Sequence, residues 1–224
     1  TNNIDNVKKF CKKNKLFLIE DSSEALGSKF KSKHLGTFGD IGLLSFNGNK
    51  IITSGGGGAL ITNRKDIYIK ARHLSQNAKL KHLWKYRYDN IGYNIAMPNL
   101  NASLGLSQAN RLSKNILNKK KLYKFYKEFL SKFSLLKISK IDKDMQSNYW
   151  LITVLISDKS LKIRDKILKY MNKRGIRSRP VWQLLHTIKV FTKYPHMEIK
   201  KAKILEKTII NLPSSPHINI DEKR

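Results

Sequence analysis

The first 115 residues alternate short apolar runs with stretches of helical spacing. The run LFLIE at 16–20 is closed by Asp21 and suits a buried strand of a parallel sheet. Similar short apolar segments follow at 41–46, around Ile51–Ile52 and at 59–62, whereas helical spacing is found at 7–15 and 66–76. Strands that alternate with helices predict an α/β architecture with a mostly parallel sheet.

The pattern changes after Met97-Pro98, where leucines and isoleucines recur at helical intervals as far as Tyr123 and predict one long helix. Beyond it, lysine-rich helical segments surround a single apolar strand at 149–156, and a helix at 164–175 is predicted to end at Gly175. We therefore expect two domains. Residues 1–115 form an α/β domain, and residues 116–224 form a smaller α+β domain.

Composition narrows the possible classes of protein. The chain has 224 residues and a single cysteine, Cys11, which excludes a disulfide scaffold and a cysteine-based zinc site, so no metal site is expected. No apolar run approaches the roughly 20 residues of a membrane span, and residues 1–15 lack the apolar core of a signal peptide. These features predict a cytoplasmic protein.

The charge is the least informative feature. Lys+Arg number 45 against 16 Asp+Glu, a formal net charge of +29, which is the electrostatic footprint of a nucleic-acid-binding protein. However, the basic residues are mostly lysines spread along the chain together with many Asn and Ile, and no nucleic-acid-binding motif is present. Compositional drift explains the charge better than a specific nucleic-acid partner.

Three segments carry candidate chemistry. Residues 20–24 (EDSSE) follow a strand, at the end where open α/β sheets bind ligands, although solvated acids in a turn are an equally simple explanation. In 44–62, Ser45 and Lys50 precede four consecutive glycines at 55–58, a combination suited to phosphate and carbonyl groups but not a Walker loop. In 89–105, Tyr93, Asn94 and Asn99 surround a helix start.

Together, EDSSEALGS, GTFGDIGLLSFNGNKIITSGGGG and IGYNIAMPNLNASLGLSQ resemble the DegT/DnrJ/EryC1/StrS family of pyridoxal-phosphate-dependent sugar aminotransferases. The resemblance runs through most of 5–115 and more loosely through 175–186 to 211–216. It implies the type I, aspartate-aminotransferase-like fold, with an N-terminally incomplete large domain followed by a small C-terminal domain. The C-terminal sequence is similar to that of members that act on UDP-linked 4-keto-6-deoxy-N-acetylhexosamines in bacillosamine or legionaminic acid synthesis.

The resemblance also implies roles for individual residues. Lys50 matches the lysine that forms a Schiff base with pyridoxal 5′-phosphate and then moves a proton. Asp21 matches the aspartate that faces the pyridinium nitrogen, and Ser45 matches a ligand of the cofactor phosphate. Asn94 matches an asparagine that reaches the phosphate of the neighbouring subunit, so a homodimer with shared active sites is implied. Arg179 and His186 match a segment near the sugar-nucleotide pocket, but a solvated turn and a packed histidine explain them equally well.

Two departures from the family pattern lead to alternatives. Glu24 stands where Gln or His is usual beside the cofactor's ring hydroxyl, and a carboxylate there would be repelled unless it is protonated or turned away. Family members also begin with a long further segment that binds the cofactor.

The leading hypothesis is an enzyme that transfers an amino group, from glutamate in most relatives, to a keto-sugar nucleotide for glycan or aminosugar synthesis. The alternative is a truncated, inactive remnant. A related dehydratase is disfavoured because those relatives lose the lysine.

Overall fold

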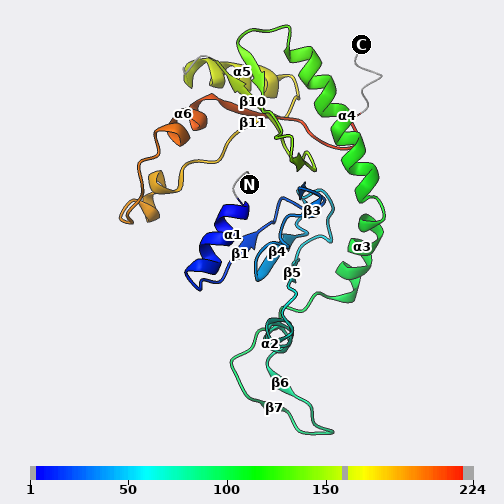
Figure 1. Cartoon of the computed structure of the whole chain (residues 1–224). Helices are drawn as coiled ribbons and strands as arrows, with labels where there is room; N and C mark the ends of the chain where they lie inside the picture. Colours follow the sequence, from blue (N-terminus) through cyan, green and yellow to red (C-terminus); the bar gives the residue numbers. More distant parts are fainter. Residues whose placement is uncertain (1–3, 158–160, 219–224) are drawn as a thin grey trace. The chain divides into compact units, whose positions relative to one another are not determined.

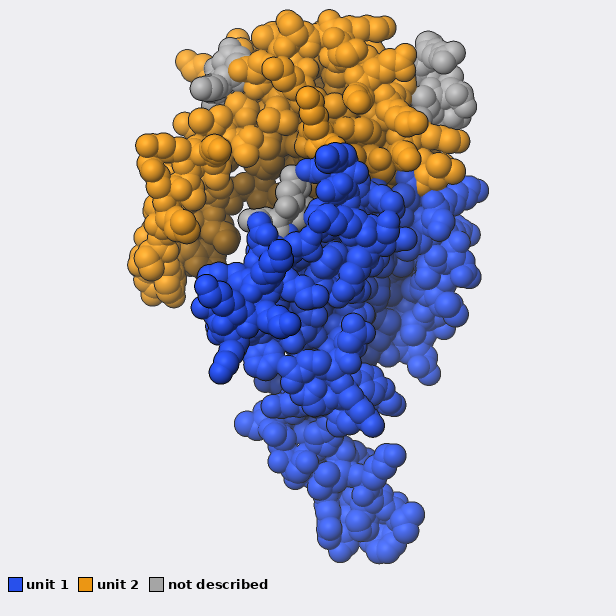
Figure 2. Space-filling model, in the orientation of Figure 1, with its two compact units in different colours: residues 1–116, 142–148 blue, residues 117–141, 149–224 orange. Residues whose placement is uncertain are grey.

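The computed structural model describes residues 4–157 and 161–218. The chain forms two compact units, which Figure 2 distinguishes by colour. Unit 1 comprises residues 1–116 together with 142–148, and unit 2 comprises residues 117–141 together with 149–224. The sequence assigns 142–148 to the second block, whereas the structure packs this segment within unit 1. The division into two functional domains stays a prediction.

The central element of unit 1 is a three-stranded sheet in the order β1-β4-β5. Strand β1 (Ile19–Asp21) is parallel to β4 (Ile41–Ser45), whereas β4 is antiparallel to β5 (Gly58–Ile61). The expected mostly parallel sheet is therefore only partly correct among the described residues. The reason is the connection: 46–57 contains no helix, and a parallel pair would need a crossover of a dozen or more residues.

A second small sheet ties unit 1 together. Strand β2 (Lys29–Phe30) pairs antiparallel with both β3 (Lys33–His34) and β9 (Met145–Gln146). Phe30, Leu35 and Phe38 form a buried cluster beside it, against which helix α1 (Ile4–Lys13) packs through Ile4. Here residues about 115 positions apart in sequence form one ladder.

The Glu20 carboxylate organises the face of the central sheet that is opposite Asp21. Glu20 is buried, and its two carboxylate oxygens accept the backbone N–H groups of Gly36 at 2.8 Å, Phe38 at 2.6 Å and Gly39 at 2.6 Å. The loop can come this close because glycines line the contact: a Cβ at Gly42 would lie 1.9 Å from the Gly36 carbonyl oxygen. One buried acid thus satisfies three backbone donors at once.

The remainder of unit 1 contains two helices and one hairpin, joined by irregular segments. Helix α2 (Lys65–Ser75) leads into strands β6 (Lys79–Leu80) and β7 (Arg87–Tyr88), and residues 76–95, which we call the arm, project from α2 (Figure 1). Helix α3 (Asn99–Ala109) begins directly after Pro98. The predicted single long helix is interrupted at 110–111 before α4 (Leu112–Leu130), where the Arg111 amide bonds to Gln108, an i−3 partner.

Unit 2 contains a four-stranded antiparallel sheet in the order β11-β12-β10-β8. Its strands are β8 (Leu136–Ile138), β10 (Ile152–Ile156), β11 (Arg179–Pro180) and β12 (Ile209–Leu212). The helical elements of unit 2 that follow β10 are α5 (Leu161–Lys173), two 3₁₀ turns (Leu185–Thr187 and Lys189–Phe191) and α6 (Lys200–Thr208). The strand predicted at 149–156 is confirmed in its C-terminal part, 152–156, where β10 alternates buried and half-buried residues. Within the described ranges, no helix is long and apolar enough to cross a membrane.

The predicted end of α5 is confirmed. Gly175 has φ +77°, its N–H donates to the Asn172 carbonyl, and the Ile176 N–H donates to the Met171 carbonyl. This pair of bonds is a Schellman motif, in which a left-handed glycine satisfies the last free carbonyls of the helix.

Helix α4 contains a buried lysine within unit 2. Lys119 donates a hydrogen bond to the Ser214 carbonyl, and burial lowers the pKa of its ammonium group to about 8. Two other side chains of α4 donate to the same segment, 213–216. Asn118 donates to the Pro216 carbonyl at 3.2 Å, and Tyr126 donates to the Pro213 carbonyl at 3.1 Å. The burial that fixes this lysine in place therefore disfavours its charged form.

We expect Lys119→Met to stabilise unit 2 at neutral pH. Since the folded pKa of about 8 lies below the ordinary lysine pKa of 10.5, Lys119 makes its full contribution to stability above pH 10.5 and loses it as the pH falls to 8. Burial of the charged Lys119 lowers the free energy of unfolding of the parent protein by about 3 kcal/mol. The variant avoids this cost but gives up roughly 1 kcal/mol, because Met cannot make the hydrogen bond to Ser214. Urea unfolding at pH 7 and pH 10 measures this, with the exposed neighbour Lys120→Met as control. A variant as pH-dependent as the parent would contradict the expectation.

Candidate active site

The candidate residues of unit 1 gather at one edge of its central sheet. Asp21 is the last residue of β1 and Ser45 the last residue of β4. Because these strands are parallel, their carboxyl ends lie at the same edge, where ligands bind in open α/β sheets. Lys50 follows in the loop at 46–57, and its backbone N–H donates to the Asn47 carbonyl at 3.0 Å.

Lys50 and Glu24 form an ion pair. The Nζ atom of Lys50 lies 2.6 Å from Oε1 of Glu24. The lysine side chain is only 11% exposed, whereas that of Glu24 is 50% exposed, so the amine is enclosed and the acid is open to solvent. The carboxylate that departs from the family pattern is therefore directed at the lysine, and this contact fixes the direction of the amine.

Asp21 is held in its ionised form. The Ser23 hydroxyl and the Ser23 backbone N–H both donate to Oδ1, and together with the positive charge of Lys50 they lower the pKa of the Asp21 carboxyl. Hydrogen bonds to a carboxylate favour its charged form. Asp21, Glu24 and Lys50 are thus brought together by the structure, while Ser45 stands at the start of the Lys50 loop and accepts the Asn47 N–H at 3.4 Å.

The glycine run closes the Lys50 loop. Gly55 and Gly57 have φ near +80°, and a Cβ at Gly58 would lie 2.3 Å from the Leu44 carbonyl oxygen. The expected close approach of backbone is therefore found at Gly58, where the neighbour is strand β4. Gly56, in contrast, has open space around its Cα.

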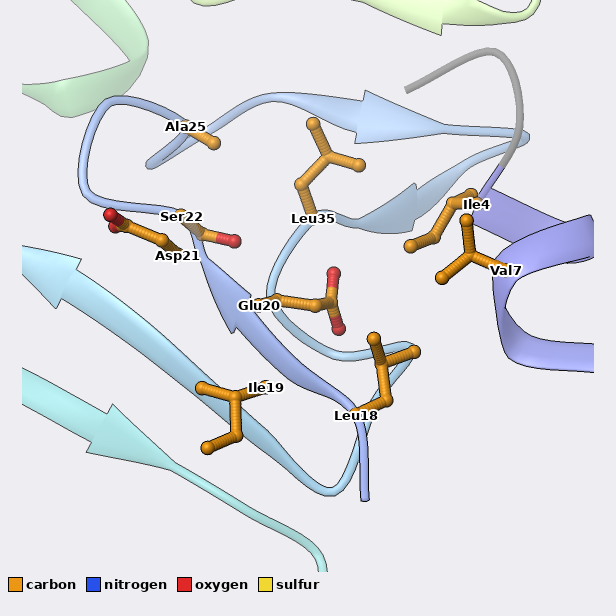
Figure 3. A pocket seen from close by; sticks show the side chains of 9 residues that line it. All are labelled: Ile4, Val7, Leu18, Ile19, Glu20, Asp21, Ser22, Ala25 and Leu35. Carbon is orange, nitrogen blue, oxygen red and sulfur yellow. The ribbon is translucent and has the colours of Figure 1, made fainter. Parts of the chain in front are cut away.

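An apolar pocket of about 310 Å³ lies beside this edge, between α1 and β1 (Figure 3). Glu20 points into it among Val7, Leu18 and Leu35, whereas the Asp21 carboxylate turns the other way. Successive strand residues face opposite sides of a sheet, which is why these two carboxylates diverge. Of the candidate residues, Asp21 is part of the pocket lining, whereas Glu24, Ser45 and Lys50 are not.

Asn94 lies at the base of the arm. It forms a bridge with Gln76, and the neighbouring Tyr93 N–H donates to the Leu74 carbonyl at 2.7 Å. The base is further fixed by an ion pair of 2.6 Å between His73 and Asp89. A role for Asn94 at the Lys50 site stays a prediction.

Arg179 and His186 belong to unit 2. Arg179 is exposed on β11 and donates to the Asn172 side chain at 3.5 Å. His186 is half-buried in a 3₁₀ turn, with its ring centroid 4.5 Å from that of His196. Their assignment to a sugar-nucleotide pocket stays a prediction.

Sequence reasoning missed the residues that hold the backbone of the Glu24 and Lys50 segments in place. Three asparagines on other elements donate to backbone carbonyls of the Glu24 and Lys50 segments. Asn148 reaches Glu24 at 2.7 Å and Leu26 at 3.0 Å, Asn101 reaches Ser54 at 2.7 Å, and Asn115 reaches Ile51 at 3.4 Å. No local pattern marks them, because each partner is at least 47 positions away in the sequence.

The full length of the chain, residues 1–224, matches the model of the DegT/DnrJ/EryC1/StrS aminotransferase family. The chain belongs to that family. It is 35% identical over 220 residues to a GDP-perosamine synthase of Escherichia coli O157:H7, a match that covers 98% of this chain and 58% of the relative.

Solved structures of DegT/DnrJ/EryC1/StrS-type enzymes share the fold. PseC of Helicobacter pylori, an aminotransferase involved in the biosynthesis of pseudaminic acid, superimposes with a TM-score of 0.91 at 25% identity, over 97% of this chain and 59% of PseC. DesI, solved in the presence of its TDP-sugar product, gives a TM-score of 0.87 at 22% identity, over 98% of this chain and 56% of DesI. The chain thus has the fold of these transferases and spans less than two thirds of their length.

Proposed function

We propose that this protein is a pyridoxal-phosphate-dependent aminotransferase that transfers an amino group to a keto-sugar nucleotide. The observation that carries the proposal is the enclosed Lys50 amine, which lies against Glu24 and within electrostatic range of the ionised Asp21. Membership of an aminotransferase family supports the same reaction class.

The residues present fit the cofactor. Pyridoxal phosphate needs a primary amine for its aldehyde, an anion for its ring nitrogen and donors for its phosphate, and Lys50, Asp21 and Ser45 supply these groups at one sheet edge. When bound, the cofactor supplies an electron sink that stabilises a carbanion next to the transferred nitrogen. The hydroxyl of Ser45 and the backbone of the loop at 46–57 are the groups that would hold its phosphate.

Each side chain has a distinct task in this proposal. Lys50 would hold the cofactor through Nζ and would move a proton at that atom. Asp21 stays ionised through its bonds from Ser23 and keeps a positive charge on the ring nitrogen. Glu24 orients the Lys50 amine through the 2.6 Å contact between Oε1 and Nζ. A lysine held in this way favours an enzyme over an inactive remnant.

The remaining parts of the proposal concern partners. Glutamate is the proposed amino donor, and Arg179 and His186 are the proposed contacts to the nucleotide sugar. Eight large apolar side chains of the arm are exposed: Leu80, Leu83, Trp84, Tyr86, Tyr88, Ile91, Tyr93 and Ile95. Such a surface suits an interface, and we propose that the arm contacts a second copy, to which Asn94 contributes. A cytoplasmic location is part of the same proposal.

Borohydride trapping tests the central claim. The protein is mixed with pyridoxal phosphate, reduced and digested, and the modified lysine is identified by mass spectrometry. We expect modification at Lys50 at stoichiometric cofactor, ahead of every other lysine, because Asp21 and Ser45 at the same sheet edge would hold the cofactor beside it. Modification spread evenly over exposed lysines, such as Lys31 and Lys120, would refute the assignment.

A further inference from the structure

Residues 142–148 form a strap within unit 1 that ends directly behind the Glu24 turn. Strand β9 of this strap pairs with β2 through Met145 and Gln146. Two residues later, the backbone N–H of Asn148 donates to the Ser28 hydroxyl at 3.0 Å. The strap is thus attached just before Asn148 and at the backbone of Asn148 itself.

The Asn148 side chain clamps the backbone next to Glu24. It is 3% exposed, and its amide nitrogen donates to the carbonyls of Glu24 at 2.7 Å and Leu26 at 3.0 Å. Both donors of one buried NH₂ group are therefore used on a single turn. The same turn is also held by the Gly27 N–H, which donates to Nε2 of His34 at 2.8 Å, and by the Ser28 N–H, which donates to the Ala25 carbonyl at 2.7 Å.

We propose that Asn148 is a positioning residue: by holding the Glu24 and Leu26 carbonyls, it sets the place of the Glu24 carboxylate and, through it, of the Lys50 amine. The step from Asn148 to Lys50 is short. The backbone of Glu24 is bonded to Asn148, and the side chain of Glu24 is bonded to Nζ at 2.6 Å. The proposal rests on the proposed function only in giving Lys50 a task. The geometry itself is independent of the cofactor.

The test measures the reactivity of the Lys50 amine without any cofactor. Acetic anhydride acylates neutral amines, and peptide mass spectrometry gives the rate at Lys50 at one fixed pH. Glu24→Gln removes the carboxylate that is paired with Nζ at 2.6 Å, so Lys50 should react faster. Asn148→Leu, of similar size but without donors, should raise the rate roughly three- to tenfold, about the equivalent of one net hydrogen bond.

A double-mutant cycle separates positioning from general loosening of the fold. In the Glu24→Gln background, Asn148→Leu should have almost no further effect on the Lys50 rate. The matched control is Asn211→Leu in unit 2, another buried asparagine with two side-chain hydrogen bonds, to Thr153 and Pro180. This control should leave the Lys50 rate unchanged.

The proposal is overturned if Asn148→Leu changes the Lys50 rate no more than the Asn211 control does, or changes it equally with and without Glu24. If Asn148→Leu does not fold, Ser28→Ala, which removes only the bond to the Asn148 N–H, replaces it and should give a smaller change in the same direction. No change in a folded Ser28→Ala would also overturn the proposal. Failure of the proposed function is seen separately, as absence of pyridoxal phosphate from Lys50 in the trapping experiment.

Discussion

Replacement of Lys50 by arginine should abolish covalent capture of pyridoxal phosphate and lower amino transfer by on the order of 10³-fold. Arginine keeps the positive charge that faces Glu24, so the ion pair of this site can persist. Its guanidinium stays protonated at any working pH and offers no neutral amine to an aldehyde. Absorbance of the bound cofactor and mass spectrometry after borohydride reduction measure capture, and release of the keto acid from the donor measures transfer.

The matched control is Lys31→Arg. Lys31 also belongs to unit 1 and also pairs with a carboxylate, that of Asp5 at 2.8 Å, but its side chain is 58% exposed. The control should capture pyridoxal phosphate and transfer nitrogen as the parent does. A Lys50→Arg protein that retains the capture and the rate of the parent would remove Lys50 from the reaction.

Glu20→Gln should destabilise unit 1 by about 3 kcal/mol or more. A glutamine of the same shape has a single acceptor oxygen, whereas three backbone N–H groups converge on the carboxylate. Its NH₂ group would face at least one of these donors in a buried position. Hydrogen exchange at the amides of Gly36, Phe38 and Gly39 reports the change directly, and exchange at those amides should accelerate by roughly 100-fold.

Glu198→Gln is the control for this experiment. Glu198 pairs with Lys200 at 2.8 Å, but both side chains are largely exposed. Exposed pairs of this kind contribute about 0–1 kcal/mol. Equal exchange rates in Glu20→Gln and the parent protein would show that the loop at 36–39 does not depend on the acid.

Local sequence patterns were sufficient where the structure is locally determined. The strand at 41–46, the helix end at Gly175 and the placement of Lys50 between a strand and a glycine run all follow from spacing within about ten residues. The role of Glu20 could not be predicted from such spacing, because its hydrogen-bond partners lie 16 to 19 positions away and the surrounding EDSSE segment is typical of a solvated turn.

Longer-range features could not be obtained in this way. The break between α3 and α4 lies within a continuous helical pattern of apolar residues, and tertiary context overrides such a pattern. Asn148 lies 124 positions from the carbonyl of Glu24 that it holds, and an isolated asparagine between Ser147 and Tyr149 carries no signal of its partner. The ion pair of Glu24 with Lys50 similarly required the fold to bring two turns together.

The arm also provides an optical probe. The chain has three tryptophans, of which Trp150 and Trp182 stack on each other in unit 2, whereas Trp84 stands 73% exposed near the tip of the arm. An indole in water emits at longer wavelength than one in an apolar contact, so Trp84 reports whether another surface covers the arm. With Trp150 and Trp182 replaced by Phe, dilution of the protein would follow association at the arm through the emission colour of a single side chain.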